Sequence, residues 1–147
     1  ESKGKFSQEY ADASLFERLN WQDTDNEKIW YKYNTGASGL TGNDYIEMSG
    51  LFSLEYVSDK LLAGKYEVSI KVDNTYSQNA TIQCYIDNVK TGGLLNLRNP
   101  IGKGNKTFKV INLGTYVYTN TQTHTFKVEA FIPGRFSWNY IQFKPVN

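Results

Sequence analysis

The sequence predicts an all-β domain, an antiparallel β-sandwich of jelly-roll type with at most one short N-terminal helix. Several segments alternate apolar and polar residues with the period of two that a half-buried strand requires. Runs of Gly, Asn, Ser and Thr separate those segments and supply turns. The composition agrees, because aromatic residues make up 15% of the chain and include 11 tyrosines, a residue type enriched in strands.

The N-terminal part carries the only helical pattern. In "ADASLFERLN", at 11–20, the apolar residues follow helical spacing, which predicts one short helix. Residues 1–20 are therefore expected to be a lead-in segment or linker, and residues 21–147 to form the β-sandwich domain. The polar start "ESKGKFSQEY" lacks the apolar region of a signal peptide, so we expect a processed exported protein or one domain of a larger protein.

The next part of the chain is expected to form three short strands and one long one. "KIWYKY", "DYIEM" and "LFSLEYV", at 28–33, 44–48 and 51–57, are rich in aromatic and branched residues. A glycine-rich loop at 34–43 separates the first two. "KYEVSIKV", at 65–72, gives the clearest pattern, because apolar residues occupy every second position.

Four more strands are expected in the C-terminal half. "ATIQCYI" at 80–86 and "HTFKVEAFI" at 124–132 alternate in the same way, which places Cys84 inward as inert core. "TFKVINL" at 107–113 and "WNYIQF" at 138–143 are less regular. The total of roughly eight strands is typical of a sandwich or jelly roll.

Charge and residue counts exclude several classes of protein. The 147 residues fit one domain. The net charge is +1 and the lysines are scattered, so the sequence does not indicate a basic surface that binds nucleic acid. One cysteine excludes a disulfide framework, and His124, the one histidine, excludes paired-histidine metal sites. The chain has no G-x-S-x-G motif for a serine nucleophile and no 18-residue apolar run for a membrane span. We therefore expect neither an enzyme nor a membrane-spanning protein.

The run from 64 to 143 resembles the galactose-binding-like β-sandwich superfamily, and within it the jelly-roll carbohydrate-binding modules of families six and thirty-five. The resemblance covers about residues 44–147 and lies in strand cores and turns. The matching positions are Gly64 and Tyr66, Asp87 with Asn88 in place of the family's glycine, Leu113 with Gly114, His124, and Asn139-Tyr140-Ile141 with Phe143.

The resemblance implies a non-catalytic module that binds a glycan through end loops or through the concave face of one sheet. In the family, two aromatic rings hold a sugar and an asparagine precedes the last strand. Here Ser137 stands where that asparagine would be, and Trp138 takes an apolar position, so Trp138 is expected to be a core plug. The family also implies a secreted or cell-surface protein of bacterial origin, tethered to other domains.

Several aromatic residues and one arginine are candidates for ligand contact, because sugar rings stack on aromatic faces while polar groups bind hydroxyls. If the neighbouring apolar residues face inward, Trp30 faces outward on a sheet, although the opposite register stays open. Tyr85, on a central strand, could also be an ordinary cross-strand partner, and for each loop residue an ordinary packing role also stays open. The candidates are Trp30, Tyr76, Tyr85, Tyr116, Arg135 and Phe136.

The acidic stretch "DTDNE", at 23–27, is the one feature that suggests a metal. Alternating oxygen ligands suit calcium, but the EF-hand glycine and terminal glutamate are absent, and a solvated acidic turn explains the stretch as well. No cofactor is expected, and a structural calcium ion stays open. The sequence therefore leaves two functions: a lectin-like carbohydrate-binding module, or a structural or protein-interaction module without a glycan site.

Overall fold

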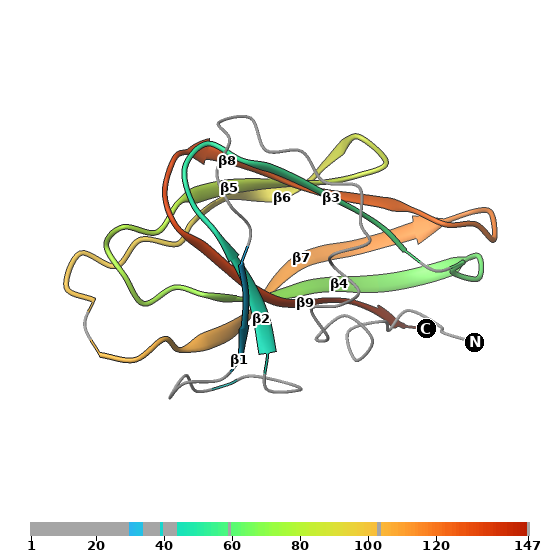
Figure 1. The fold of residues 1–147 in the computed structure, drawn as a ribbon. Coiled ribbons are helices and arrows are strands. Elements are labelled where there is room, and N and C mark those ends of the chain that lie inside the picture. Colours follow the sequence, from blue (N-terminus) through green and yellow to red (C-terminus); the bar gives the residue numbers. More distant parts are fainter. Residues whose placement is uncertain (1–29, 34–38, 40–43, 59, 103, 147) are drawn as a thin grey trace.

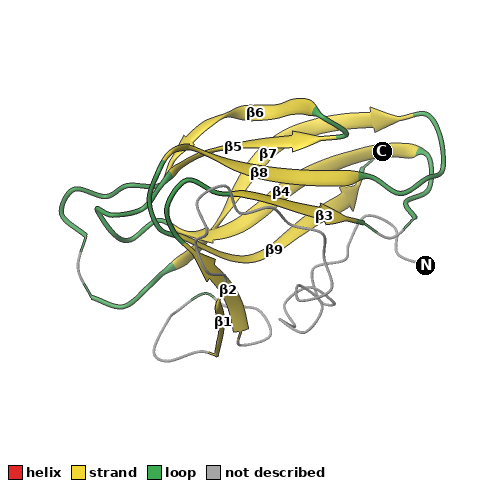
Figure 2. Ribbon diagram, turned by 45° about the horizontal axis from the view of Figure 1, so that its top comes forward, coloured by secondary structure: helices red, strands yellow, loops and turns green. Residues whose placement is uncertain are grey.

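Two antiparallel sheets lie face to face and enclose one hydrophobic core (Figure 1). The computed structural model describes residues 30–33, 39, 44–58, 60–102 and 104–146. Those residues form strands and connections without a helix (Figure 2). The strands are β1 (Trp30–Tyr33), β2 (Asp44–Met48), β3 (Ser53–Val57), β4 (Gly64–Asp73), β5 (Thr81–Ile86), β6 (Val89–Asn96), β7 (Phe108–Tyr118), β8 (Thr125–Ile132) and β9 (Phe136–Pro145).

The strand order is that of a sandwich whose chain passes repeatedly between the sheets. The five-stranded sheet has the order β1-β2-β9-β4-β7, and the four-stranded sheet has the order β3-β8-β5-β6. All the pairings between these nine strands are antiparallel, so the predicted antiparallel β-sandwich is confirmed. None of the described residues forms a helix that could cross a membrane.

The core follows the alternation that the sequence predicted. In β4, Val68, Ile70 and Val72 are fully buried, and polar residues alternate with them. Cys84 in β5 is also fully buried, and burial raises the pKa of its thiol to about 12, which confirms the inert core position. Trp138 is 1% exposed, so the expected core plug is confirmed as well. Burying one such apolar side chain contributes about 1.5–3 kcal/mol.

The structure corrects three expectations about strands. Residues 89–96, which the sequence did not predict as a strand, form β6 at the edge of the four-stranded sheet. Strand β7 continues to Tyr118, so Tyr116 lies in a strand and not in a loop. Strand β9 begins at Phe136, two residues earlier than expected. The lead-in segment 1–20, its helix and the acidic stretch 23–27 lie outside the described residues.

Four connections gather at one end of the sandwich, at the left in Figure 1. They join β2 to β3, β4 to β5, β6 to β7 and β8 to β9. Their described residues are 49–52, 74–80, 97–102, 104–107 and 133–135. Because they come from both sheets, polar side chains distant in the sequence can meet here. We call this the loop end.

Candidate functional site at the loop end

Backbone hydrogen bonds hold the β8–β9 connection against its neighbours. Gly134 exchanges two hydrogen bonds with Gly50, at 3.0 and 3.1 Å, and the Arg135 amide donates to the Gln78 carbonyl at 2.8 Å. A Cβ atom at Gly134 would lie 2.6 Å from the Gln78 carbonyl oxygen, a separation that no side chain tolerates. Glycine is therefore required where this loop crosses the β4–β5 connection, and the crossing fixes the position of Arg135.

A buried carboxylate joins the β4–β5 and β6–β7 connections. Asp73 is 1% exposed, and its Oδ1 accepts the amides of Thr75 and Thr107 at 3.1 and 3.2 Å. Its Oδ2 accepts the Asn79 side-chain amide at 3.2 Å, and that amide also donates to the Leu97 carbonyl at 3.2 Å. Hydrogen bonds to a carboxylate contribute about 1.5–3 kcal/mol each. Asp73 is thus a structural anchor with its oxygens already occupied.

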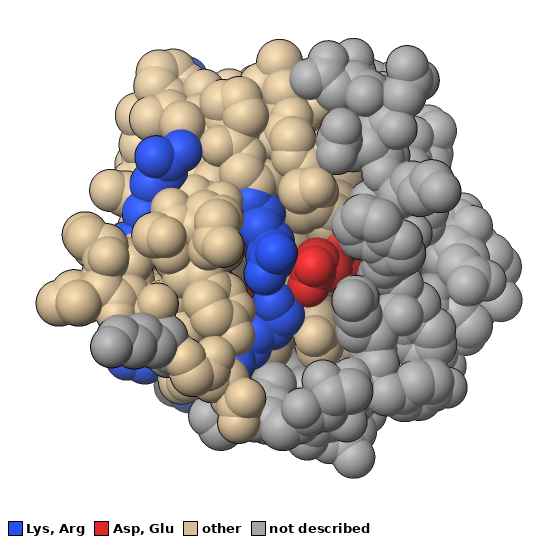
Figure 3. Space-filling view, turned by 60° about the vertical axis from the view of Figure 1, so that its left-hand side comes forward, with Lys and Arg blue, Asp and Glu red and all other residues tan. Residues whose placement is uncertain are grey.

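A second carboxylate, Glu47 in β2, lies between two cations. Lys106 Nζ is 3.2 Å from Glu47 Oε1, and Arg135 Nε is 3.8 Å from Glu47 Oε2. The Ser137 hydroxyl donates to Glu47 Oε1 at 3.2 Å. The side chains of Glu47 and Lys106 are 11% and 12% exposed, whereas that of Arg135 is 37% exposed. Figure 3 shows basic side chains beside an acidic group on this end of the molecule.

Tyr76 lies over the same ion group. Its ring centroid is 4.9 Å from Lys106 Nζ and 5.7 Å from the Arg135 guanidinium carbon, distances typical of cation–π contacts. Its hydroxyl donates to the Gly104 carbonyl at 2.6 Å, so the half-buried ring is fixed in orientation. We call Glu47, Tyr76, Lys106 and Arg135 the loop-end cluster.

Tyr45 borders the loop-end cluster from β2, where it lies two residues before Glu47. Its ring packs on Phe108 with centroids 5.0 Å apart, and it is 4% exposed. Burial, followed by the nearby charge of Glu47, raises the pKa of the Tyr45 hydroxyl to about 12. The phenol therefore stays protonated at neutral pH. Together these groups offer ammonium and guanidinium donors and a carboxylate acceptor around one aromatic ring, which is chemistry suited to a polar, hydroxylated ligand.

The structure brings two of the six predicted ligand residues together, Tyr76 and Arg135. Tyr85 lies on β5 in the other sheet, under Lys127 Nζ at 4.6 Å from its ring, and Tyr116 lies in β7. Phe136 is 1% exposed, so its expected loop position beside a ligand is wrong: the ring is part of the core.

The sixth candidate, Trp30, is described only in part. Its backbone lies in β1 opposite Glu47, while its side chain lies outside the described residues, so its outward orientation stays a prediction. Glu47 and Lys106 were not among the candidates predicted from the sequence. The strand "DYIEM" did place Tyr45 and Glu47 on one face, because they are two residues apart. Lys106 gave no such signal.

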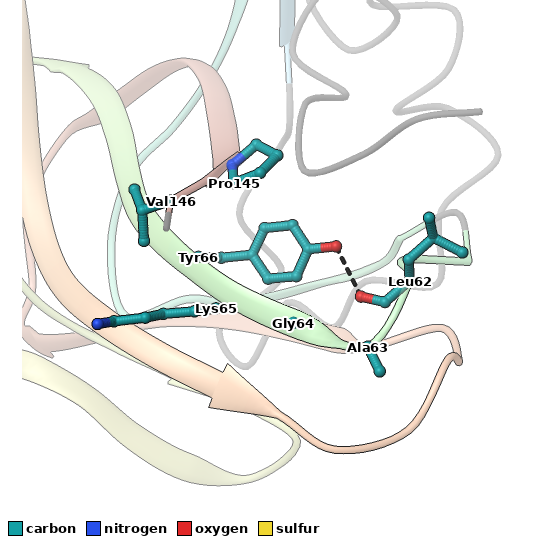
Figure 4. Close-up of a pocket in the computed structure, with 7 residues that line it drawn as sticks. All are labelled: Leu62, Ala63, Gly64, Lys65, Tyr66, Pro145 and Val146. Carbon is teal, nitrogen blue, oxygen red and sulfur yellow. Dashed lines mark hydrogen bonds between the residues drawn. The ribbon is translucent and has the colours of Figure 1, made fainter.

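The surface is also hollowed at a place away from the loop-end cluster. At the end opposite the loop end, a pocket of about 160 Å³ is lined by residues 62–66 with Pro145 and Val146 (Figure 4). The Tyr66 hydroxyl points across it and donates to the Leu62 carbonyl at 2.6 Å, which uses its hydrogen-bonding group. The described residues include no group of three or more His, Cys, Asp or Glu side chains that could hold a metal ion.

Comparisons with known proteins reveal similarity of structure alone. No family model matches the chain, and no curated protein matches its sequence. Among solved structures, a xanthan lyase from Paenibacillus matches 88% of this chain and 13% of its own, with a TM-score of 0.68 and 12% identity. A GH26-CBM35 β-(1,4)-mannanase from Podospora anserina matches 85% of this chain and 27% of its own, with a TM-score of 0.57 and 14% identity.

A third solved structure corresponds in size to this chain. The C-terminal CBM6 of a marine laminarinase from Zobellia galactanivorans matches 88% of this chain and 94% of its own, with a TM-score of 0.55 and 14% identity. The chain thus spans only a small part of the xanthan lyase and the mannanase, but nearly all of the separate module. At these identities the comparisons establish the fold: a β-sandwich similar in structure to carbohydrate-binding modules of polysaccharide enzymes.

Proposed function

We propose that this chain is a non-catalytic carbohydrate-binding module that holds a glycan at the loop end. The observation that carries the proposal is the convergence of Tyr76, Glu47, Lys106 and Arg135 at the end of a sandwich similar to such modules. Loops held on a rigid sandwich are where binding residues concentrate. Lys106 and Arg135 would donate to sugar hydroxyl or carboxylate oxygens, and Glu47 would accept hydroxyl protons.

The carboxylates at the loop end support binding without chemistry. Glycosidic cleavage ordinarily uses two carboxylates, one as acid and one as base or nucleophile. Asp73 is 1% exposed and its oxygens already hold the loop amides, so it is a poor partner for Glu47. Glu47 Oε1 and Oε2 contact Lys106 and Arg135, so both oxygens of this carboxylate are already held in ion pairs.

We also propose that the module acts outside a bacterial cell, in a secreted or surface protein with further domains. The support is that the similar structures include parts of larger enzymes whose names refer to polysaccharides. A site with few exposed groups is expected to bind weakly. Tethering to other domains would raise the overall affinity through effective concentration.

A glycan array followed by affinity electrophoresis on soluble polysaccharides tests the proposal. Arg135→Ala and Tyr76→Ala should each weaken binding roughly tenfold or more, which corresponds to about 1.4 kcal/mol. Matched controls are Lys144→Ala, an exposed cation at the far end of β9, and Tyr85→Ala, a half-buried tyrosine of the other sheet. Both controls should bind as the unchanged protein does, with and without a calcium chelator.

The result against the proposal is equally specific. If no glycan binds the folded protein, the carbohydrate hypothesis is wrong. If a glycan binds but the Tyr85→Ala variant loses it while Tyr76→Ala keeps it, the module is a lectin whose site is not at the loop end. Circular dichroism of every variant confirms that folding is intact.

A structural or protein-interaction module is the second candidate, and exposed apolar side chains favour it. Phe131 is 64% exposed and Ile132 is 40% exposed at the end of β8, and Leu94 on the edge strand β6 is 50% exposed. Such residues are common at protein contacts. Two results together would support this candidate. The first is that no glycan on the array binds the protein, and the second is a concentration-dependent association that Phe131→Ser abolishes.

A further inference from the structure

A second hollow lies away from the loop end, between the edge strands of the two sheets. Strand β6 is the edge of the four-stranded sheet and β7 is the edge of the five-stranded sheet, and they lie on the same side of the sandwich (Figure 2). The cavity between them has a volume of about 220 Å³. We call it the side groove, and its lining residues are Ile86, Asp87, Val89, Lys90, Thr91, Tyr116, Val117 and Tyr118.

One tyrosine ties the two edge strands together and closes the groove at one side. The Tyr116 hydroxyl accepts a hydrogen bond from the Gly92 amide in β6 at 3.1 Å and donates to the Leu113 carbonyl in β7 at 2.5 Å. Gly92 has a φ of 73°, a conformation that glycine adopts without cost. The groove is therefore a built feature of both sheets rather than a gap between loose ends.

A carboxylate with an open side lines the other wall. Asp87 occupies the tight β5–β6 turn with a φ of 52°, and its Oδ1 accepts the Thr125 amide at 2.9 Å. Its Oδ2 lies 2.6 Å from Nδ1 of His124, whose side chain is 1% exposed, whereas the Asp87 side chain is 39% exposed. Each carboxylate oxygen can accept a further hydrogen bond. Asp87 is thus fixed in orientation yet open to a ligand.

Tyr118 supplies the aromatic wall beside that carboxylate. His124 contacts its ring with centroids 4.3 Å apart, which holds the ring in place. Burial, followed by the charge of Asp87, raises the pKa of the Tyr118 hydroxyl, so the phenol remains a donor at any physiological pH. Val89 and Val117, each 66% exposed, form the apolar rim.

We propose that the side groove is a second binding site, which takes a single neutral sugar residue. The sugar ring would stack on Tyr118 between the rim valines, and its hydroxyls would bind Asp87, Lys90 and the Tyr118 hydroxyl. The volume of about 220 Å³ is below the ~300–1,000 Å³ of pockets for drug-sized ligands, so one ring fits and a folded oligomer does not. The choice of a sugar as ligand rests on the proposed function; the position of the groove does not.

Titration of the ¹⁵N-labelled chain, monitored by ¹H–¹⁵N correlation spectra, tests this site separately from the loop end. The probes are D-glucose, D-galactose, D-mannose and D-xylose, each added alone. A bound sugar should shift the amides of 86–91 and 116–118 in a saturable way. The loop-end amides, at 76–79, 104–107 and 135, report the first site independently. Shifts in one group without the other separate the two proposals.

A blocking variant and a matched control make the assignment specific. Val117→Lys places a long side chain in the rim without touching the core, and it should weaken the groove response roughly tenfold or more. Val89→Lys blocks the groove from the opposite wall, and it replaces Val117→Lys in the experiment if that variant folds poorly. Val110→Lys is the control, because Val110 belongs to the same strand, is 54% exposed and lies outside the groove.

Two results would overturn the inference. The first is that no probe shifts the groove amides at its highest soluble concentration, whatever happens at the loop end. The second is that groove shifts persist unchanged in both blocking variants, which would mean that the sugar binds elsewhere and moves these amides indirectly. Groove shifts that vanish in Val117→Lys and persist in Val110→Lys would establish the site.

Discussion

Replacing Phe136 with alanine separates the two roles that an aromatic residue near a binding loop can have. The side chain is 1% exposed, stacks on Phe52 at a centroid distance of 5.4 Å and an angle of 13°, and lies 6.2 Å from Trp138. Burial of the ring contributes about 1.5–3 kcal/mol, and each aromatic pair adds about 0.5–1.5 kcal/mol. Together with the cavity left behind, Phe136→Ala should cost about 3–5 kcal/mol.

Urea unfolding measures this loss against a matched control. A domain of this size is stable by roughly 5–15 kcal/mol, so the variant should unfold at a clearly lower urea concentration with an unchanged slope. Phe131→Ala removes the same side chain at a position that is 64% exposed, and it should change the free energy of unfolding by less than about 0.5 kcal/mol. A Phe136→Ala loss below about 1 kcal/mol, combined with lost glycan binding, would refute the core role.

Three further outcomes are expected. The free energy of unfolding should fall as the pH rises from about 10 toward 12. The reason is that burial, and then the charge of Glu47, raises the pKa of Tyr45 to about 12 in the folded chain, so Tyr45 ionises first in the unfolded chain. Urea unfolding at each pH should show a smaller fall for the Tyr45→Phe variant. A thiol reagent at pH 8 should label Cys84 only after unfolding, since burial raises its pKa to about 12, and rapid native labelling would contradict this. Gly134→Ala should cost about 1–3 kcal/mol in urea unfolding, whereas Gly93→Ala, which meets nothing within 4 Å, should be neutral or stabilise by up to about 1 kcal/mol.

Strands buried on one face were predictable, and edge strands were not. Strands β4 and β8 alternate because one face of each packs in the core, and that burial is visible in the sequence. The sequence of β5 alternates as well, although its polar residues Thr81 and Gln83 are also buried. Strand β6, "VKTGGLLN", lies at a sheet edge with most of its side chains exposed, so neither alternation nor β propensity marks it. In β7, the expected strand ended at residue 113, just before Gly114. Its φ of 116° accompanies an irregularity in the pairing with β4, and the strand continues beyond it.

The proposed binding residues were predictable only where a side chain was of an unusual type for its segment. Tyr76 and Arg135 stood out as an aromatic and a cation in polar loops. Glu47 and Lys106 did not, because their significance arises from a contact between β2 and the β6–β7 connection that only the folded chain creates. Periodicity reports which face of a strand is buried. It carries no information on which distant loops meet.

The two proposed sites should recognise sugars in different ways, and the reason is the position of the cations. At the loop end, Lys106 and Arg135 lie over the Tyr76 ring, so a sugar meets ammonium and guanidinium groups before it meets an aromatic face. Recognition there should depend on hydrogen bonds and charge, and therefore weaken with added salt. In the side groove, no described cation lies over the Tyr118 ring, which is backed by His124. Stacking should dominate at that site, and its affinity should change little with salt.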